Sequence, residues 1–434
     1  MRLPVLTCIL VLTAAAAMLR PAAGEQLPAG PLTVDDAIRI ALENHGSVSA
    51  AAEGVLASRQ RVIQARTGTL PRVTGEVSYT VSGQELRTGG SQDWESFTRS
   101  SDGAQPRVAV SYNIYDGGLT RASVRQASAE ERSSRAGLAA VRNSLSLQVA
   151  QAFFNQLRAL RTLEIRRQLE GLAEQQLRAV EARIEAGAAA PADRALPLSE
   201  LRNRQVDVVQ AENDLAVSAV TLRQLMGLPP GPALELQEVS GQLDAGNLDQ
   251  WLEAARKNRP ELVEAQARVE SAAASLEAAR VRRSPRVDLA AAYDLTPASD
   301  SRRQDWTVGA AISMPLWDGQ LTAAQVAEAE ARLRAARATL EQQEKDVASE
   351  VTRAYRNLVS ALERVEATKA ALEAARVNLE SETERYRLQA AGSSVLALQT
   401  AQVQYATAST NDIQARYDVQ AAWSQLQQAI GGLQ

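Results

Sequence analysis

The chain has almost none of the residue types from which most reaction and metal centres are built. Among its 434 residues there is one cysteine, Cys8, and one histidine, His45. One residue of each type cannot form a zinc site or a Cys-His or Ser-His nucleophile. Because Cys8 lies in an N-terminal stretch that we expect to be removed, no disulfide is expected either. We therefore expect no enzymatic activity, no metal and no cofactor.

Aromatic residues and net charge are also low. Phe, Trp and Tyr make up 4% of the chain, and the formal net charge is −4. The abundance of Ala, Leu, Gln, Arg and Glu is typical of long coiled helices rather than of one thick globular core. Arginines are spaced among acids instead of forming a basic patch, so nucleic acid is not an expected partner.

Only the N-terminus carries a long apolar run. Residues 1–24 begin with Arg2, continue as an apolar run to Leu19 and end in Ala22-Ala23-Gly24. This is the pattern of a secretory signal peptide. A first transmembrane anchor is the alternative, but the run is near the short limit for spanning a bilayer. We expect 1–24 to be a signal peptide and the rest of the chain to be exported.

The remainder of the chain contains an internal repeat. Three short motifs recur in the same order, roughly two hundred positions further along. They are Leu70-Pro71-Arg72-Val73 with Ser284-Pro285-Arg286-Val287, Tyr115-Asp116-Gly117 with Trp317-Asp318-Gly319, and Leu225-Met226-Gly227 with Ala429-Ile430-Gly431. Each pair is weak alone, but their common order indicates a tandem duplication. We predict a first repeat over 25–230, a linker over 231–246 and a second repeat over 247–434.

Four segments alternate apolar and polar residues, as strands with one apolar face do. We predict strands at about 72–82 and 106–115, with 82–105 as an external loop, and at about 286–295 and 305–316. At about ten residues each, they are long enough to cross a bilayer when tilted. A soluble hairpin on a core is the alternative, but the helices offer little apolar cover. On the water-facing side lie Glu76, Asp288 and Asp294, which either line a pore or are simply solvated.

Each repeat also contains an opening helix and a helical hairpin. We predict long helices over about 118–186 and 320–390, with return helices over about 192–227 and 394–430. Seventy residues give a rod of about 100 Å. Val351, Leu358 and Val365 recur every seven residues, which indicates helices that coil around neighbours. The pattern does not separate an ordinary coiled coil from a wall of packed helices. The fold class predicted is mainly α with a small β part.

The borders between strand and long helix carry a shared chemistry. An aromatic residue precedes Asp-Gly at both places: Tyr115, Asp116 and Gly117 in the first repeat, and Trp317, Asp318 and Gly319 in the second. An aromatic side chain suits a membrane–water interface, Asp can cap a helix N-terminus, and Gly permits a sharp turn.

This joint order of motifs resembles the outer membrane factors, the TolC-like trimeric efflux and secretion channels, over nearly all of the mature chain. Four strands cannot close a barrel, and an open sheet leaves its edges unpaired in lipid. The resemblance implies a homotrimer in which each copy gives four strands to a 12-stranded barrel in the outer membrane. It also implies a periplasmic helical tube that docks on an adaptor protein and an inner-membrane transporter.

The turns at the far ends of the two helical hairpins are the candidate partner-binding positions. In the first tip, adaptor contact or gating is assigned to Gly187, Asp193, Arg194, Leu196 and Ser199. A simple turn with a capping Asp explains that motif equally well. The second tip has Gly392, Ser393 and Ser394, but it lacks the two acids that many relatives carry, so it predicts no acidic gate.

A different class of protein remains as the runner-up. A periplasmic coiled-coil adaptor or scaffold would also contain long helices, with its strands in a soluble sheet. Such an adaptor is expected to carry a compact lipoyl-like β domain between its helical arms, and the sequence shows no such stretch.

Overall fold

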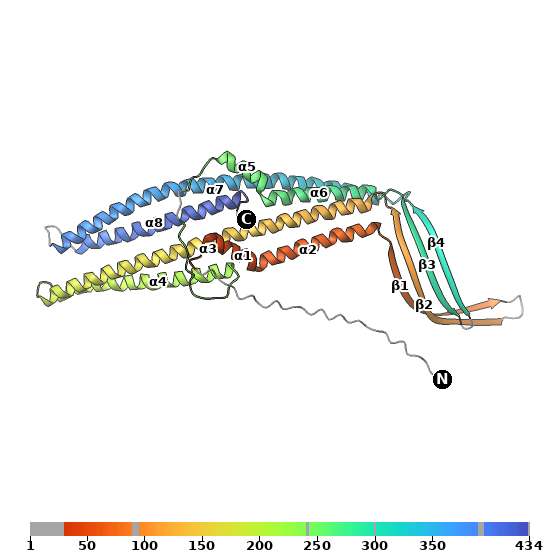
Figure 1. Cartoon of the computed structure of the whole chain (residues 1–434), viewed down its shortest axis with the longest axis horizontal. Helices are drawn as coiled ribbons and strands as arrows, with labels where there is room; N and C mark the ends of the chain where they lie inside the picture. The colour runs from red at the N-terminus through yellow and green to blue at the C-terminus, as the bar shows by residue number, and fades with distance from the viewer. Residues whose placement is uncertain (1–29, 89–94, 240–242, 299–300, 389–394, 433–434) are drawn as a thin grey trace, which may run out of the picture.

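The computed structural model describes residues 30–88, 95–239, 243–298, 301–388 and 395–432. The predicted signal peptide lies outside these residues. The chain is elongated, with helical hairpin tips at one end and a small sheet at the other (Figure 1). The predicted fold class, mainly helical with a small β part, is confirmed. None of the described helices has both the length and the apolar character needed to cross a bilayer.

The two halves of the chain have the same order of elements. The first half contains α1 (Val34–Asn44), α2 (Gly46–Arg66), β1 (Arg72–Thr88), β2 (Glu95–Tyr115), α3 (Leu119–Glu185) and α4 (Ala195–Leu225). Short 3-10 turns, η1 (Thr67–Thr69) and η2 (Pro191–Arg194), precede β1 and α4. The second half contains α5 (Leu248–Asn258), α6 (Pro260–Val281), β3 (Arg286–Ala298), β4 (Ser301–Ser313), α7 (Leu321–Arg387) and α8 (Val395–Ala429).

The prediction of one opening helix per repeat is wrong, because each is broken into two. The break falls at His45, which is extended with φ −73° and ψ 127°, and at Arg259, with φ −68° and ψ 117°. The ring Nδ1 of His45 accepts a hydrogen bond from the backbone N of Ser47 at 3.3 Å, which caps α2. At the second break Pro260 opens α6, where its missing N–H costs nothing.

All four strands form one antiparallel sheet in the order β1-β2-β3-β4. The β2–β3 pair joins the two halves of the chain, and β1 and β4 are the open edges of the sheet. β1 and β2 are 17 and 21 residues long and pair as far as Thr88 with Glu95. The prediction of a loop over 82–105 is therefore wrong for most of its length. There the backbone N–H and C=O groups of β1 and β2 form hydrogen bonds with each other. β4 ends at Ser313, before the predicted 316, because Pro315 lacks a ladder N–H.

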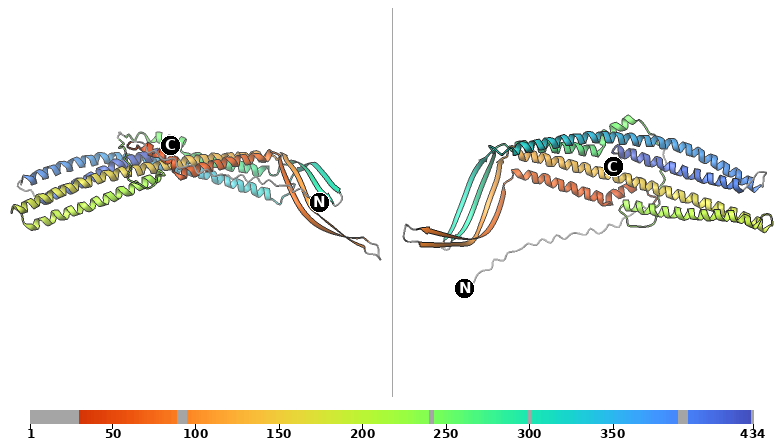
Figure 2. Two further views of the ribbon diagram at one scale, coloured as in Figure 1. Left: turned by 60° about the horizontal axis from the view of Figure 1, so that its bottom comes forward. Right: turned by 180° about the vertical axis from the view of Figure 1, so that it is seen from behind.

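The long helices α3 and α7 are each 67 residues, which corresponds to about 100 Å. They run the length of the helical part, and all views place the sheet at their N-terminal end (Figures 1 and 2). Two cores lie in the middle of the molecule. One gathers around Phe153 and Leu222 of α3 and α4, and the other around Leu358 and Leu426 of α7 and α8.

Burial along the seven-residue pattern changes with position. Val351 and Leu358 are fully buried in the middle of α7, whereas Val365 is only partly buried. On α4, Val206 and Val209 are 68% and 66% exposed. The two largest clusters of buried apolar residues thus lie near the centre, smaller clusters lie towards the tips and the sheet, and several apolar positions of the helical hairpins remain exposed.

Candidate functional site

The sheet separates its two faces by polarity. On one face Val73, Val77, Val308 and Ile312 are between 66% and 77% exposed. Nothing in the described part of the chain covers them. This apolar face, more than any single motif, distinguishes the sheet from a hairpin that packs on a soluble core, because such a hairpin buries its apolar side.

The opposite face carries a row of charges that crosses all four strands. Glu76 of β1 pairs with Arg107 of β2, Arg107 with Asp294 of β3, and Asp294 with Asp305 of β4. Directly paired residues project to the same side of a sheet. The Arg107 Nε lies 3.6 Å from the Asp294 Oδ1. Three carboxylates and one guanidinium therefore form a line across the strands. We call this line the charged row.

The third predicted strand charge lies closer to the helices. Asp288 pairs with Asn113 in the register, and the Asn113 Nδ2 donates to its Oδ1 at 2.7 Å. Sequence patterning placed Glu76, Asp288 and Asp294 on one face, and the structure brings them there. The sequence pattern alone could not identify Arg107 and Asp305 as their neighbours, because this requires the pairing register between strands that are far apart in the chain.

The two strand-to-helix turns are built alike. Asp116 accepts hydrogen bonds at its carboxylate from the backbone N of Gly118 at 2.9 Å and of Thr120 at 2.7 Å. Asp318 accepts from the Thr322 backbone N at 3.0 Å and from its hydroxyl. Each carboxylate thus satisfies N–H groups of the first helical turn.

The same contacts hold both carboxylates in the charged form. Burial raises the pKa of Asp116, but hydrogen bonds from Thr120 and neighbouring backbone groups outweigh it, so the pKa is lowered. The pKa of Asp318 is lowered mainly by its Thr322 hydrogen bonds.

Backbone conformation explains the glycines of these turns. Gly117 and Gly118 have φ of 69° and 94°, and Gly319 has 62°. Gln320 follows Gly319 with φ 73° and is the one non-glycine residue with positive φ among the described residues. The aromatic partners Tyr115 and Trp317 are 52% and 87% exposed. They lie at the sheet's helical end, on the surface.

The first hairpin tip is closed by local contacts. Gly187 turns the chain with φ 70°, and the Asp193 carboxylate accepts from the Ala190 backbone N at 3.0 Å. Arg194 Nε donates back to Glu181 of α3 at 2.7 Å. Leu196 and Ser199 are exposed on the first turns of α4. The structure therefore gives Asp193 a capping contact and leaves Leu196 and Ser199 free to meet another molecule.

Sequence reasoning missed the contact that joins the two tips. Arg183 Nη1 of α3 donates to the Tyr386 hydroxyl of α7 at 3.4 Å. The Arg183 Nε and both amide atoms of Gln176 are buried nearby without a hydrogen-bond partner. No local pattern signals a pair 203 positions apart. Gly392, Ser393 and Ser394 of the second tip lie outside the described residues.

Within the part of the chain that the structure describes, no three His, Cys, Asp or Glu side chains are grouped to hold a metal ion. The apolar sheet face, the charged row on its opposite side and the hairpin tips are the surfaces whose geometry bears on function.

Comparison with known proteins agrees with this arrangement. The chain matches the family described as "Outer membrane efflux protein" over residues 37–228 and 251–432. It is 25% identical over 293 residues to the cobalt-zinc-cadmium resistance protein CzcC of Cupriavidus metallidurans, an alignment that covers 67% of this chain and 64% of that protein. It is 24% identical to the outer membrane protein TolC of Vibrio cholerae, over 87% of this chain and 85% of that protein.

A solved structure shows the same fold. CusC, whose structures are described in terms of transmembrane channel formation, superposes with a TM-score of 0.78 at 21% identity, over 92% of both chains.

Proposed function

The chain belongs to the outer membrane efflux protein family, and from this we propose that it is the outer-membrane channel of a tripartite efflux or type I secretion system. In this proposal three copies form a passive conduit across the outer membrane and periplasm. A periplasmic adaptor couples it to an inner-membrane transporter that supplies the energy. A signal peptide over residues 1–24 directs its export.

The observation that carries the proposal is the exposed apolar face on a sheet with two open edges. In lipid, the unpaired N–H and C=O groups of β1 and β4 would each cost several kcal/mol. Pairing β1 of one copy with β4 of the next removes both edges. Three copies then give twelve strands, an even number within the range of such barrels. The charged row faces inward and the apolar face meets lipid.

The helices at the sides of the chain support the same assembly. α2 and α4 flank α3 on the side of β1, and α7 lies at the other side with β4 (Figure 1). The exposed Val206 and Val209 lie on α4, and Val377 of α7 is 56% exposed. These three exposed valines lie on helices at the same two sides as the unpaired strands. Neighbouring copies would cover both.

Fractionation and cross-linking test the assembly directly. The channel proposal expects the protein in the outer-membrane fraction, extracted only by detergent, with a cross-linked mass of three chains. Thr74→Cys on β1, combined in turn with cysteines along the same face of β4 such as Thr307→Cys, should at the paired register form an intermolecular disulfide ladder that stops at the trimer, because barrel closure staggers the strands. Recovery as a monomer in the soluble periplasmic fraction would favour the adaptor alternative and defeat the channel.

The charged row predicts the ion preference of the pore. Neutralising two of its acids with Glu76→Gln and Asp294→Asn should lower the cation-to-anion permeability ratio on the order of twofold, because fixed charges in a pore attract counter-ions. Arg107→Gln should raise the ratio. The measurement is the reversal potential in planar bilayers under a KCl gradient. Thr74→Ser, on the same face, is the neutral control.

The two opposite shifts make this test decisive. If the reversal potential moves in neither variant, the charged row does not face the conduction path. If both variants shift in the same direction, altered packing rather than charge is responsible.

The contact between the tips predicts different single-channel conductances for substitutions at Tyr386 and at Asp193. Tyr386→Phe removes the hydroxyl that accepts from Arg183, so the tips of α3 and α7 separate more easily and single-channel conductance should rise on the order of twofold. Asp193→Ala should leave conductance nearly unchanged and cost about 1 kcal/mol of local stability, as loss of a helix cap does. If conductance rises in Asp193→Ala but not in Tyr386→Phe, Asp193 rather than the Arg183–Tyr386 contact restrains the tips, and the prediction is wrong.

The exposed Leu196 and Ser199 are the positions we assign to adaptor contact, together with Gly187, Arg194 and residues 392–394. Leu196 and Ser199 are exposed at the start of α4, and the α3–α4 hairpin turns at the end farthest from the sheet (Figure 2). A partner that extends the tube has to meet this end, because the other end is occupied by the barrel.

A further inference from the structure

A cavity of about 1030 Å³ lies in the middle of the helical part, where α3, α7 and α8 meet the linker between the two halves. The linker contributes Glu238, Val239, Leu243 and Asp244 to its wall. The volume is at the upper end of those that bind drug-sized molecules, about 300–1,000 Å³. Neither the barrel nor the tips involve this cavity, so the proposed channel function does not explain it.

Part of the wall is apolar. Phe154 and Ile165 of α3, Leu362 of α7 and Ile413 of α8 line the cavity. Phe154 also contacts Phe153 edge to face, with ring centroids 5.7 Å apart, which fixes its orientation. Such a wall can hold the aromatic or aliphatic body of a ligand.

The charges that line the cavity are mostly negative. The carboxylates are Glu164, Glu238, Asp244, Glu366 and Asp412, and the guanidiniums are Arg161 and Arg416. Arg161 donates to Glu238 and to Glu164, each at 2.6 Å, so its charge is already matched. Tyr417, whose pKa is raised by burial and by Glu238, remains a neutral donor beside this group.

The α8 side of the cavity holds an unsatisfied acceptor. Asp412 is 3% exposed, and its Oδ2 lies 2.8 Å from Arg416 Nε. Its Oδ1 is buried without a hydrogen-bond partner, and so is the hydroxyl oxygen of Ser409, one turn earlier. An unsatisfied buried carboxylate oxygen is costly, and an ionised carboxylate can only accept.

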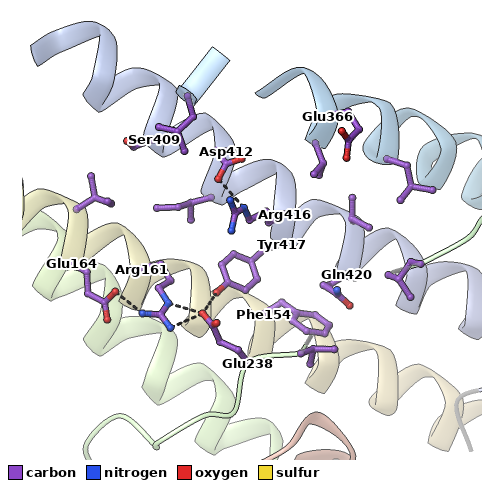
Figure 3. A pocket seen from close by; sticks show the side chains of 18 of the residues that line it. Phe154, Arg161, Glu164, Glu238, Glu366, Ser409, Asp412, Arg416, Tyr417 and Gln420 are labelled. Carbon is purple, nitrogen blue, oxygen red and sulfur yellow. Dashed lines mark hydrogen bonds and ion pairs between the residues drawn. The ribbon is translucent and has the colours of Figure 1, made fainter. Parts of the chain in front are cut away.

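Glu366 reaches the same side of the cavity from α7. It is exposed, and within the described ranges it has no ion pair or hydrogen bond. Figure 3 shows Ser409, Asp412 and Glu366 together along the α7–α8 side, across from Arg161, Glu164 and Glu238. Arg416 on this side contacts the Oδ2 of Asp412, so its charge matches one of the two carboxylates, and among the side chains that the structure describes Glu366 remains without a cationic partner.

We propose that this cavity binds an amphiphilic organic cation, in which a positively charged nitrogen centre is joined to or part of an apolar or aromatic body. The cationic group faces the carboxylates of Asp412 and Glu366, which line the same side of the cavity. The body lies against Phe154 and Ile413. The site lies within the helical region, so ligand binding to it can be measured on the isolated protein, without transport.

Ethidium is a suitable probe, because it combines a permanent cation and two amino donors with a planar aromatic body and becomes fluorescent when it leaves water. The full-length protein in detergent should give a saturable fluorescence increase. Asp412→Asn and Glu366→Gln should each weaken binding about tenfold, since each removes a negative charge from the wall that the cationic group faces. Glu363→Gln removes an exposed carboxylate of α7 outside the cavity and should change affinity by less than about twofold.

Two further measurements keep the test decisive. Because Asp412→Asn also affects Arg416, its helix content is compared by circular dichroism, and Glu366→Gln, at an exposed position, serves as the variant without this risk. Excess Mg²⁺ should not displace the probe, since an inorganic cation gains nothing from the apolar wall. Lack of saturable binding, equal affinity in Glu366→Gln and Glu363→Gln, or displacement by Mg²⁺ at probe concentrations would each overturn the proposal.

Discussion

Gly117→Ala is expected to cost about 2–4 kcal/mol of stability, the sum of strain at positive φ and a steric clash. Gly117 has φ 69°, and a Cβ built on it would lie 2.3 Å from the Cβ of Ser284 and 2.9 Å from its hydroxyl oxygen. The turn between β2 and α3 therefore packs on the turn between α6 and β3. The loss is measured as the shift in heat or denaturant unfolding of the detergent-solubilised protein.

The next residue provides a matched control. Gly118 also has positive φ, 94°, but nothing lies within 4 Å of a Cβ built there. Gly118→Ala should therefore show the backbone strain alone, about 1–2 kcal/mol. The double variant Gly117→Ala with Ser284→Gly removes the clash and should recover to the level of Gly118→Ala. If Gly117→Ala is no worse than Gly118→Ala, the close packing of the two turns is not what makes glycine necessary.

Arg259→Met is expected to destabilise the second half by about 2–4 kcal/mol, because it leaves the buried Ala429 carbonyl and two carboxylates without their donor. Arg259 is 4% exposed and joins three helices. Its Nη1 donates to the Ala429 carbonyl at 2.8 Å, its Nη2 to Glu350 at 2.6 Å and its Nε to Glu261 at 2.8 Å. Methionine retains an unbranched apolar stem but none of these donors.

Two comparisons separate this role from general loss of charge. Arg259→Lys keeps the charge without the planar fork and should lose less stability than Arg259→Met. Arg256→Met removes an exposed arginine of α5 and should change stability by less than about 0.5 kcal/mol. Thermal unfolding followed by circular dichroism ranks the stabilities of the three variants. Equal stability of Arg259→Met and Arg256→Met would contradict a clamping role for Arg259.

The sequence predicts best what local periodicity controls. Alternation in the strands places Glu76 and Asp294 on the polar face, and seven-residue spacing identifies Val351 and Leu358 as buried positions. Both follow from the geometry of a single element, which needs no knowledge of its neighbours. The Asp-Gly pairs at Asp116 and Asp318 are equally local, because each carboxylate caps the helix that follows it.

Features that depend on distant segments escaped prediction. The second helices α2 and α6 were not predicted, although His45-Gly46 and Pro260 are local signals of a helix boundary. The end of α8 comes close to the second break, where a Cβ on Gly431 would lie 2.6 Å from the Asn258 carbonyl. The Arg183–Tyr386 contact and the charged row likewise need the packing or the register. The outer parts of β1 and β2 were predicted as loop because they are polar and contain glycine. They form strands nonetheless, since each segment pairs with the other across a short connection in the chain.

The unequal length of the two β-hairpins has a consequence for the extracellular mouth. β1 and β2 have 17 and 21 residues, whereas β3 and β4 have 13 each, and the first hairpin extends beyond the second (Figure 2). In the proposed trimer, long and short hairpins would alternate around the threefold axis, so the outer rim of the barrel would be uneven. A molecule approaching from outside the cell would then meet three projecting hairpins first, and exported molecules would have lateral exits between them.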